Sequence, residues 1–279
     1  MTVTIIAECG VSHNGSVDEA LRMCDAAKES GANICKFQTY LPEIAIDKNS
    51  KDYDLLYNLA LPFTDFLKIA KHCEDIGIEF CSTPDDLYSL KFLVDECGVK
   101  RIKIGSGSLT YTPLLEAAYS SRLPIILSTG MASILEIADA LPDGFLTGYQ
   151  IPTPKITLLH CVSLYPCPIE LANLKAITTI YERFKLPIGY SDHTLSVVAI
   201  PCAAVALGAT VIEKHFTLNR YAEGPDHAMS LDPYQFSEMV REIRKVEKAL
   251  GDGTKTIREQ EAAMIPRIRK SEDGKQPGL

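Results

Sequence analysis

The chain has 279 residues, 46% of them hydrophobic and 23% charged, which is typical of a globular enzyme with a large apolar core. Its 28 Lys and Arg against 36 Asp and Glu give a net charge of -8, which argues against nucleic acid or an anionic membrane as a partner. No apolar run reaches transmembrane length, and nine cysteines without a C-x-x-C pair indicate a reducing compartment, so we expect a cytoplasmic protein.

Short β-branched runs alternate with amphipathic stretches along the whole sequence. In chain order, the runs predict strands at residues 3–9, 34–39, 78–83, 101–105, 124–128, 156–162, 186–191 and 211–216. The amphipathic stretches predict helices at residues 17–30, 64–76, 85–97, 112–120, 133–141, 169–184, 195–207 and 233–250. Eight strand–helix repeats predict an α/β fold, a single (β/α)8 TIM barrel. A doubly wound open sheet is the competing architecture, but it would normally have fewer repeats and a glycine-rich first turn.

Two connections between these elements are unusually long. Residues 40–62 follow the second strand and are a candidate lid or substrate loop, and residues 219–232 follow the eighth strand. Asp85 after Pro84 and Asp232 before Pro233 predict helix starts.

Polar side chains end the predicted strands, where a barrel of this kind forms its active site. These candidates are Glu8, Lys36, Gln38, Thr83, Lys103, Ser106, Ser128, Ser163, Tyr165, Ser191, His193, Glu213 and His215. Asp226, in the loop after the eighth strand, could reach over the mouth of the barrel.

Two histidines, His193 and His215, occupy matched positions on the last two strands. Side chains alternate across a strand, so Ser191 shares a face with His193, and Glu213 shares one with His215. A strand–helix–strand unit makes these strands parallel neighbours, so we expect the imidazoles to meet at one end of the sheet. Either histidine alone would be an ordinary core residue, but the pair beside a carboxylate predicts a divalent metal site.

Two lysines, Lys36 and Lys103, emerge from apolar strands close to several hydroxyl groups. Either lysine could instead extend past its strand end into solvent, and each hydroxyl alone could be a turn residue. As a set, the lysines with Thr83, Ser106 and Ser128 predict a phosphate site, because a buried lysine needs a compensating anion. The residues alone therefore indicate a barrel enzyme that uses a metal and a phosphate, and they do not name the reaction.

Several longer motifs occur in order along the chain. They are IIAECGVSHNG (residues 5–15), CKFQT (35–39), STP (82–84), KIGSG (103–107), LSTGM (127–131), LLHCVSLYP (158–166), GYSDHT (189–194), VIEKHFTL (211–218) and GPDH (224–227). With these motifs, the chain resembles the sialic acid synthase (N-acetylneuraminate synthase) family from residue 5 to about residue 262. The resemblance implies a (β/α)8 barrel that condenses phosphoenolpyruvate with N-acetylmannosamine, or a related N-acetylated hexosamine, and water. The products would be a nine-carbon 2-keto sugar acid and phosphate.

The resemblance also implies roles for individual residues. It makes His193 and His215 ligands of a divalent metal, typically Mn²⁺, with Mg²⁺ or Co²⁺ as alternatives. It assigns phosphoenolpyruvate to Lys36, Thr83, Lys103, Ser106, Ser128 and Ser191. Ser163, a further predicted substrate-binding residue, stands where some members of the family have Asn near the enolpyruvate. It assigns the sugar or the reacting oxygens to Glu8, Gln38, Tyr165 and Asp226. Glu8, Glu213 and Lys36 are the predicted catalytic residues, with Glu213 as an acid/base or water-orienting group.

The domain organisation expected from the resemblance is a catalytic barrel over residues 1–262 and a disordered polar tail over residues 263–279. The C-terminal antifreeze-like domain that most relatives carry, and through which they form a domain-swapped dimer, is expected to be absent. A homodimer without that domain is left open. A synthase that uses a phosphorylated aldose and a non-catalytic barrel retained for binding are the alternative functions. The acceptor sugar is not determined by the sequence.

Overall fold

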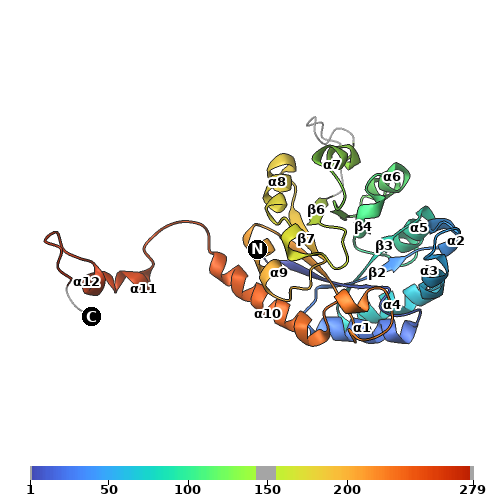
Figure 1. The fold of residues 1–279 in the computed structure, drawn as a ribbon, viewed down its shortest axis with the longest axis horizontal. Helices are drawn as coiled ribbons and strands as arrows, with labels where there is room; N and C mark the ends of the chain where they lie inside the picture. The colour runs from blue at the N-terminus through green and yellow to red at the C-terminus, as the bar shows by residue number, and fades with distance from the viewer. Residues whose placement is uncertain (1, 143–154, 277–279) are drawn as a thin grey trace. The chain divides into compact units, whose positions relative to one another are not determined.

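The computed structural model describes residues 2–142 and 155–276, and its strands and helices alternate along the chain (Figure 1). The strands are β1 (Thr4–Gly10), β2 (Ile34–Thr39), β3 (Glu79–Pro84), β4 (Ile102–Ile104), β5 (Ile125–Ser128), β6 (Ile156–Cys161), β7 (Ile188–Asp192) and β8 (Val211–His215). Each lies within a residue or two of a predicted strand, because a buried parallel strand reads as a short, nearly continuous apolar run.

The eight strands form one parallel sheet in the order β3-β2-β1-β8-β7-β6-β5-β4. Neighbours in this order are joined by hydrogen bonds, and β3 and β4 at its two ends also contact each other. The sheet therefore curls into a nearly closed barrel, and Figure 1 shows helices surrounding the strands. The predicted (β/α)8 barrel is confirmed.

The main helices follow the strands in turn. They are α1 (Val17–Glu29), α4 (Phe63–Ile76), α5 (Leu87–Asp95), α6 (Thr112–Ser120), α7 (Ile134–Ala140), α8 (Lys175–Phe184), α9 (Ala199–Ala206) and α10 (Pro233–Leu250). The long connection after β2 contains two short helices, α2 (Pro42–Ala45) and α3 (Tyr53–Leu59). Its role as a lid or substrate loop stays a prediction.

The start of α5 differs from the prediction. Asp86, and not Asp85, is the N-cap, since its side chain accepts a hydrogen bond of 2.8 Å from the backbone N–H of Ser89. Two adjacent aspartates gave the same sequence signal, and Asp85 is left without a capping role.

Two other predicted helices begin too early in the sequence. The segment expected to be helical from residue 169 starts with a 3₁₀ turn, η2 (Ile169–Leu171), and Asn173 then adopts a φ of 43°, which interrupts the helix before α8. The helix predicted from residue 195 begins only at Ala199.

The barrel interior has two layers, built from alternate residues of the same strands. The lower layer is a separate buried apolar cluster of Ile6, Ile34, Cys81, Ile126, Leu159 and Val211. The upper layer lies two residues further along these strands and consists of Glu8, Lys36, Thr83, Ser128, Cys161 and Glu213. Gly189 of β7 completes the interior, because a Cβ there would lie 2.6 Å from the carbonyl oxygen of Val211.

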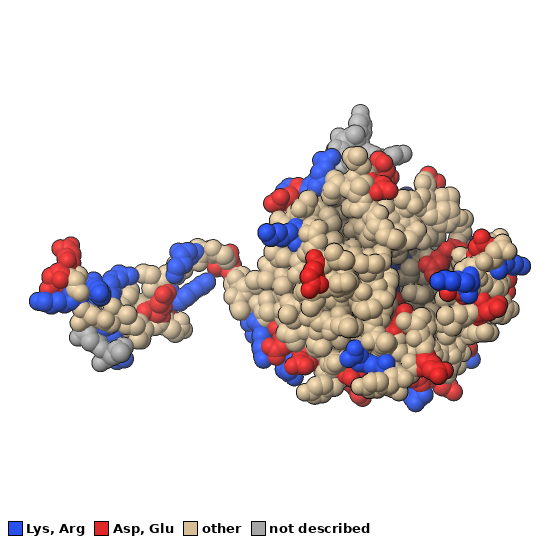
Figure 2. All heavy atoms as spheres, in the orientation of Figure 1, with Lys and Arg blue, Asp and Glu red and all other residues tan. Residues whose placement is uncertain are grey.

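The chain divides into two compact units, Met1–Glu247 with the barrel and Lys248–Leu279. The described part of the second unit contains the end of α10, α11 (Glu259–Ala262) and α12 (Ile265–Ile268). The predicted domain boundary at residue 262 and the disorder of the tail stay predictions. Within residues 2–142 and 155–276, no helix has the length and apolarity needed to cross a bilayer. Figure 2 shows acidic and basic side chains mixed on the face that it draws.

Candidate active site

A pocket of about 330 Å³ opens at the C-terminal ends of the strands. All the predicted site residues except Asp226 line it: Glu8, Lys36, Gln38, Thr83, Lys103, Ser106, Ser128, Ser163, Tyr165, Ser191, His193, Glu213 and His215. Asp85, Gly105, Gly107, Met131 and Cys161 also line it and were not predicted as site residues. The tertiary structure thus brings together side chains as far apart in the sequence as Glu8 and His215.

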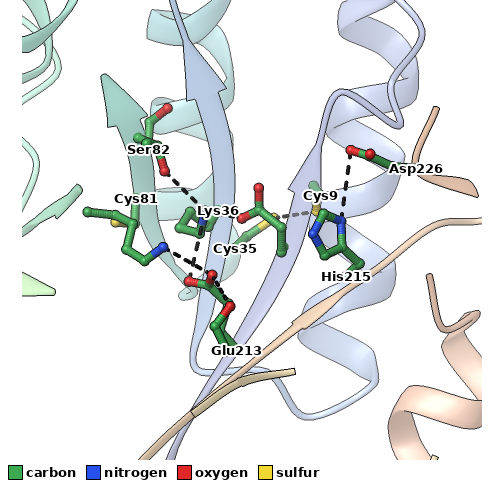
Figure 3. Close-up of polar contacts among 12 residues, drawn as sticks. Cys9, Cys35, Lys36, Cys81, Ser82, Glu213, His215 and Asp226 are labelled. Atoms are coloured by element: carbon green, nitrogen blue, oxygen red, sulfur yellow. Dashed lines mark hydrogen bonds and ion pairs between the residues drawn. The ribbon is translucent and has the colours of Figure 1, made fainter. Parts of the chain in front are cut away.

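Four buried charged side chains form the floor of this pocket. Lys36 makes an ion pair with Glu8, its Nζ lies 3.9 Å from Glu213 Oε2, and it donates a hydrogen bond of 3.1 Å to Thr83 Oγ1. Lys103 Nζ donates to Glu213 Oε1 at 3.1 Å. Figure 3 shows Lys36 and Glu213 facing each other. A lone buried charge would be strongly destabilising, and two lysines with two carboxylates offset one another.

The two carboxylates of this cluster have pKa values shifted in opposite directions. Burial, opposed by Lys36, raises the pKa of Glu8 to about 7. Burial also acts on Glu213, but Lys103 and Lys36 outweigh it and lower its pKa to about 2. Glu8 can therefore gain or lose a proton near neutral pH, while Glu213 keeps a fixed negative charge.

The two predicted metal ligands lie next to each other at the mouth. The ring centroids of His193 and His215 are 5.7 Å apart. His193 Nδ1 is 2.7 Å from the carbonyl oxygen of Val162, so Nδ1–H donates there and Nε2 keeps its lone pair, 3.3 Å from Ser191 Oγ. Buried Nδ1 of His215 has no hydrogen-bond partner in the described part of the chain and faces Asp226 Oδ2 at 3.8 Å (Figure 3). Burial lowers the pKa of both imidazoles, so both are neutral at pH 7.

These two imidazoles fit a divalent ion at an open site. Neutral histidines with a free lone pair are the form that binds metal. Over the described ranges, no group of three or more His, Cys, Asp or Glu side chains is arranged to hold a metal ion. A closed structural site is therefore not formed here, whereas a catalytic metal needs coordination positions open to substrate or water. The metal and its identity stay predictions.

The hydroxyls of Ser106, Ser128 and Ser163 line the pocket, and those of Ser106 and Ser163 lie close to Gly130. The backbone N–H of Gly130 donates to Ser106 Oγ at 3.0 Å, and a Cβ at this position would lie only 2.8 Å from the same oxygen. The hydroxyls of Ser128 and Ser163 are buried and make no hydrogen bond within the described residues. Such hydroxyls are available to donate to an anion held by the lysines.

Tyr165, Gln38 and Asp226 lie around the rim. The Tyr165 ring, 56% exposed, is centred 4.3 Å from the His193 ring and 5.8 Å from that of His215. Asp226 folds back over β1, where Gly10 has a φ of 48° and a Cβ would lie 2.8 Å from Asp226 Oδ2. The rim therefore offers polar and aromatic groups to the part of a substrate that lies outside the charged floor.

Sequence reasoning missed a buried ion pair behind the histidines. Asp192 and Lys214 are register partners on β7 and β8, fully buried, with Oδ2 and Nζ 2.8 Å apart. Lys214 also donates to the carbonyl oxygen of Thr194. Because each member immediately precedes a predicted metal ligand, the pair fixes the ends of both strands. The sequence did contain a signal for this pair: Lys214 lies within an apolar strand, and the preceding strand ends in Asp192.

Comparison with known proteins gives a consistent result. The model of the NeuB family matches residues 23–255. An N,N'-diacetyllegionaminic acid synthase from Legionella pneumophila is 40% identical over 285 residues, covering 97% of this chain and 80% of the relative. The N-acetylneuraminate-9-phosphate synthase of Mus musculus is 36% identical over 286 residues, covering 96% and 76%. The crystal structure of an N-acetylneuraminic acid synthetase from Leptospira borgpetersenii, in complex with citrate, is similar with a TM-score of 0.88 and 38% identity, covering 95% and 90%.

Proposed function

We propose that this chain, which belongs to the NeuB family, condenses phosphoenolpyruvate with an N-acetylated hexosamine and water to give a nine-carbon 2-keto sugar acid and phosphate. Family membership confirms the resemblance found in the sequence. The observation that carries the proposal is one pocket that combines a lysine and hydroxyl site for an anion with two neutral histidines. Relatives named as synthases of legionaminic and sialic acids support an enzyme of carbohydrate biosynthesis.

Phosphoenolpyruvate is the ligand that best matches the charged floor. Its phosphate and carboxylate would take over the lysines that now pair with Glu8 and Glu213. The unpartnered hydroxyls of Ser128 and Ser163 would donate further hydrogen bonds. These donors are held on rigid strand ends, so the enol carbon would be presented in a fixed orientation.

The two histidines would hold the divalent cation, and we propose Mn²⁺ before Mg²⁺ or Co²⁺. Bound there, the cation would supply Lewis-acid polarisation of the aldehyde oxygen of the open-chain sugar. The hydrogen bond from His193 Nδ1 to the carbonyl oxygen of Val162 orients this imidazole toward the cation. The Asp192–Lys214 ion pair fixes the backbone just before His215 and so positions the second imidazole. Tyr165 beside both rings would limit access of water.

The reaction forms a C–C bond between the enol carbon of phosphoenolpyruvate and the aldehyde carbon. Positive character then develops at the carbon that bears the phosphate oxygen, and the fixed charge of Glu213 would stabilise it. Water adds to that carbon and gives up a proton, which Glu8 is suited to accept because its pKa is raised to about 7. The aldehyde oxygen, which received the electron pair of its C=O bond when the C–C bond formed, takes up a proton and becomes a hydroxyl. The C–O bond to phosphate then breaks as the hydroxyl derived from water loses its proton and becomes the 2-keto oxygen, and Lys36 and Lys103 hold the charge of the departing phosphate.

The test is phosphate release from phosphoenolpyruvate with Mn²⁺, measured across unphosphorylated N-acetylated hexosamines and phosphorylated aldoses. Release that requires both the metal and an N-acetylated hexosamine is the expected outcome. Release with a phosphorylated aldose alone would move the protein to the alternative synthase. If no sugar in the panel supports phosphate release although phosphoenolpyruvate still binds in calorimetry, the proposal is contradicted and a non-catalytic barrel is favoured.

A further inference from the structure

The pocket has enough positive side chains to bind the anionic groups of one substrate, and not of two. Among the described residues that line it, the lysines are Lys36 and Lys103, and none is an arginine. Both lysines already face carboxylates, at Glu8 and Glu213. On the proposed function, the phosphate and carboxylate of phosphoenolpyruvate use both lysines. A second phosphate, on the acceptor sugar, would have no cationic partner among these side chains.

Asp85 adds a negative charge to the wall of the same pocket. It follows directly after β3, and its backbone N–H bonds to the carbonyl oxygen of Thr39 at 3.1 Å, which fixes it beside the end of β2. Its neighbour Asp86 points into the structure and accepts hydrogen bonds from the backbone N–H groups of Ser89 and Leu41. The Asp85 side chain makes no such hydrogen bond with the described part of the chain; it borders the pocket, where its surface is open to solvent while the surrounding wall partly desolvates it. Within the described residues, the Asp86 side chain is therefore tied to the fold by hydrogen bonds, whereas the Asp85 side chain makes none.

The charges around Asp85 show which part of the pocket it faces. Burial by the pocket wall, opposed by the positive charge of Lys36, raises the pKa of Asp85 to about 6, so the carboxylate is mostly ionised at pH 7. Burial and then the charges of Asp85 and Asp226 raise the pKa of Tyr40. Asp85 and Asp226 thus act on one region, near the ends of β1, β2 and β3. Asp85 adds a negative charge to this side of the mouth, whereas in the floor the two lysines are offset by Glu8 and Glu213.

We propose that Asp85 is a specificity-determining residue for the acceptor: it accepts hydrogen bonds from hydroxyl or amide N–H groups of an unphosphorylated amino sugar and disfavours a phosphorylated one. This inference rests on the proposed function and names the substrate class of the same site. A carboxylate can accept two hydrogen bonds from neighbouring sugar groups, and it repels a phosphate placed at the same distance. A phosphorylated acceptor would need the opposite charge at this position.

The experiment compares N-acetylmannosamine with N-acetylmannosamine 6-phosphate as acceptors, in the full chain and in Asp85→Asn. We expect the unmodified chain to have the higher kcat/KM with the unphosphorylated sugar. Asp85→Asn should raise the KM for that sugar about tenfold, which is the lower end of the effect expected when a hydrogen bond to a charged group is lost. The KM for phosphoenolpyruvate should stay within about twofold. The preference over the phosphorylated sugar should narrow in parallel.

Asp86→Asn is the matched control. It should lower the unfolding temperature and leave the ratio of kcat/KM for the two sugars unchanged, because the hydrogen bonds of its side chain within residues 2–142 and 155–276 go to the backbone N–H groups of Leu41 and Ser89 and to the Ser89 hydroxyl. A preference for the phosphorylated sugar in the unmodified chain, or an unchanged ratio in Asp85→Asn, would overturn the inference.

Binding of each sugar to the chain saturated with phosphoenolpyruvate, measured by calorimetry, separates this inference from the proposed function. Tighter binding of N-acetylmannosamine than of its 6-phosphate, weakened about tenfold by Asp85→Asn, would support the role of Asp85 even if no phosphate were released. Release without any effect of Asp85→Asn on binding would leave the synthase intact and remove Asp85 from it.

Discussion

The lower and upper layers of the barrel interior lie two residues apart on the same strands and differ completely in chemistry. Ile6 precedes Glu8 on β1, and Val211 precedes Glu213 on β8. The lower layer is an apolar cluster that stabilises the barrel by burial. The upper layer contains charges that are as deeply buried, which burial alone would penalise. The difference shows where the fold gives up stability for a binding site.

The largest effect is expected at His215, which lies on β8 two residues beyond Glu213 and therefore above the upper layer. We expect His215→Ala to reduce metal-dependent phosphate release to background, since one imidazole cannot hold the ion alone. Mn²⁺ binding, followed by calorimetry, should be lost in parallel while the fold persists in circular dichroism. Normal turnover in this variant would remove the metal assignment.

Removing a charge from the upper layer should be the next largest effect. Glu213→Ala leaves Lys103 without its partner and takes from Lys36 one of its two, so we expect a loss of about 3–5 kcal/mol in the free energy of unfolding. Urea denaturation measures this loss. A loss below about 1 kcal/mol would mean that water or rearrangement compensates both lysines, contrary to a tightly coupled cluster.

The raised pKa of Glu8 gives the upper layer a pH dependence that the lower layer lacks. Its pKa is about 7 in the folded chain against an ordinary 4.5, so the folded state binds the proton more tightly. Stability from this group is complete below pH 4.5 and falls as the pH rises toward 7, by at most about 1.4 kcal/mol per pH unit. The free energy of unfolding, measured by denaturation between pH 4.5 and 7, should fall with that slope in the unmodified chain and not in Glu8→Gln. Equal pH dependence in the two proteins would contradict the prediction.

The smallest effect should come from the lower layer. Ile126→Val removes one methylene from a buried contact, and we expect a loss of about 0.5–1.5 kcal/mol in the free energy of unfolding. The KM for phosphoenolpyruvate should not change, because Ile126 lies one inward step below Ser128 and does not line the pocket. A changed KM would show that packing in the lower layer sets the position of the upper one.

Most of the fold and the candidate site could be predicted because both depend on local periodicity. The strand at residues 34–39 and the helices at 112–120 and 233–250 have their predicted bounds, since apolar spacing and Pro starts are local signals. Collecting the polar residues at strand ends placed Glu8, Lys36 and the rest in one pocket. The break at Asn173 had no comparable signal, because a left-handed φ there depends on how the chain packs over the barrel.

The sequence by itself determined the barrel, the family and the residue types at the strand ends, because repeat number, alternation and motif order are properties of the chain alone. Only the tertiary structure decided how the charges are shared: that Lys36 lies between two glutamates, that Glu8 and Glu213 have opposite pKa shifts, and that Asp85 faces the pocket while Asp86 caps a helix. These outcomes depend on distance and burial, and both are set by residues far apart in the sequence.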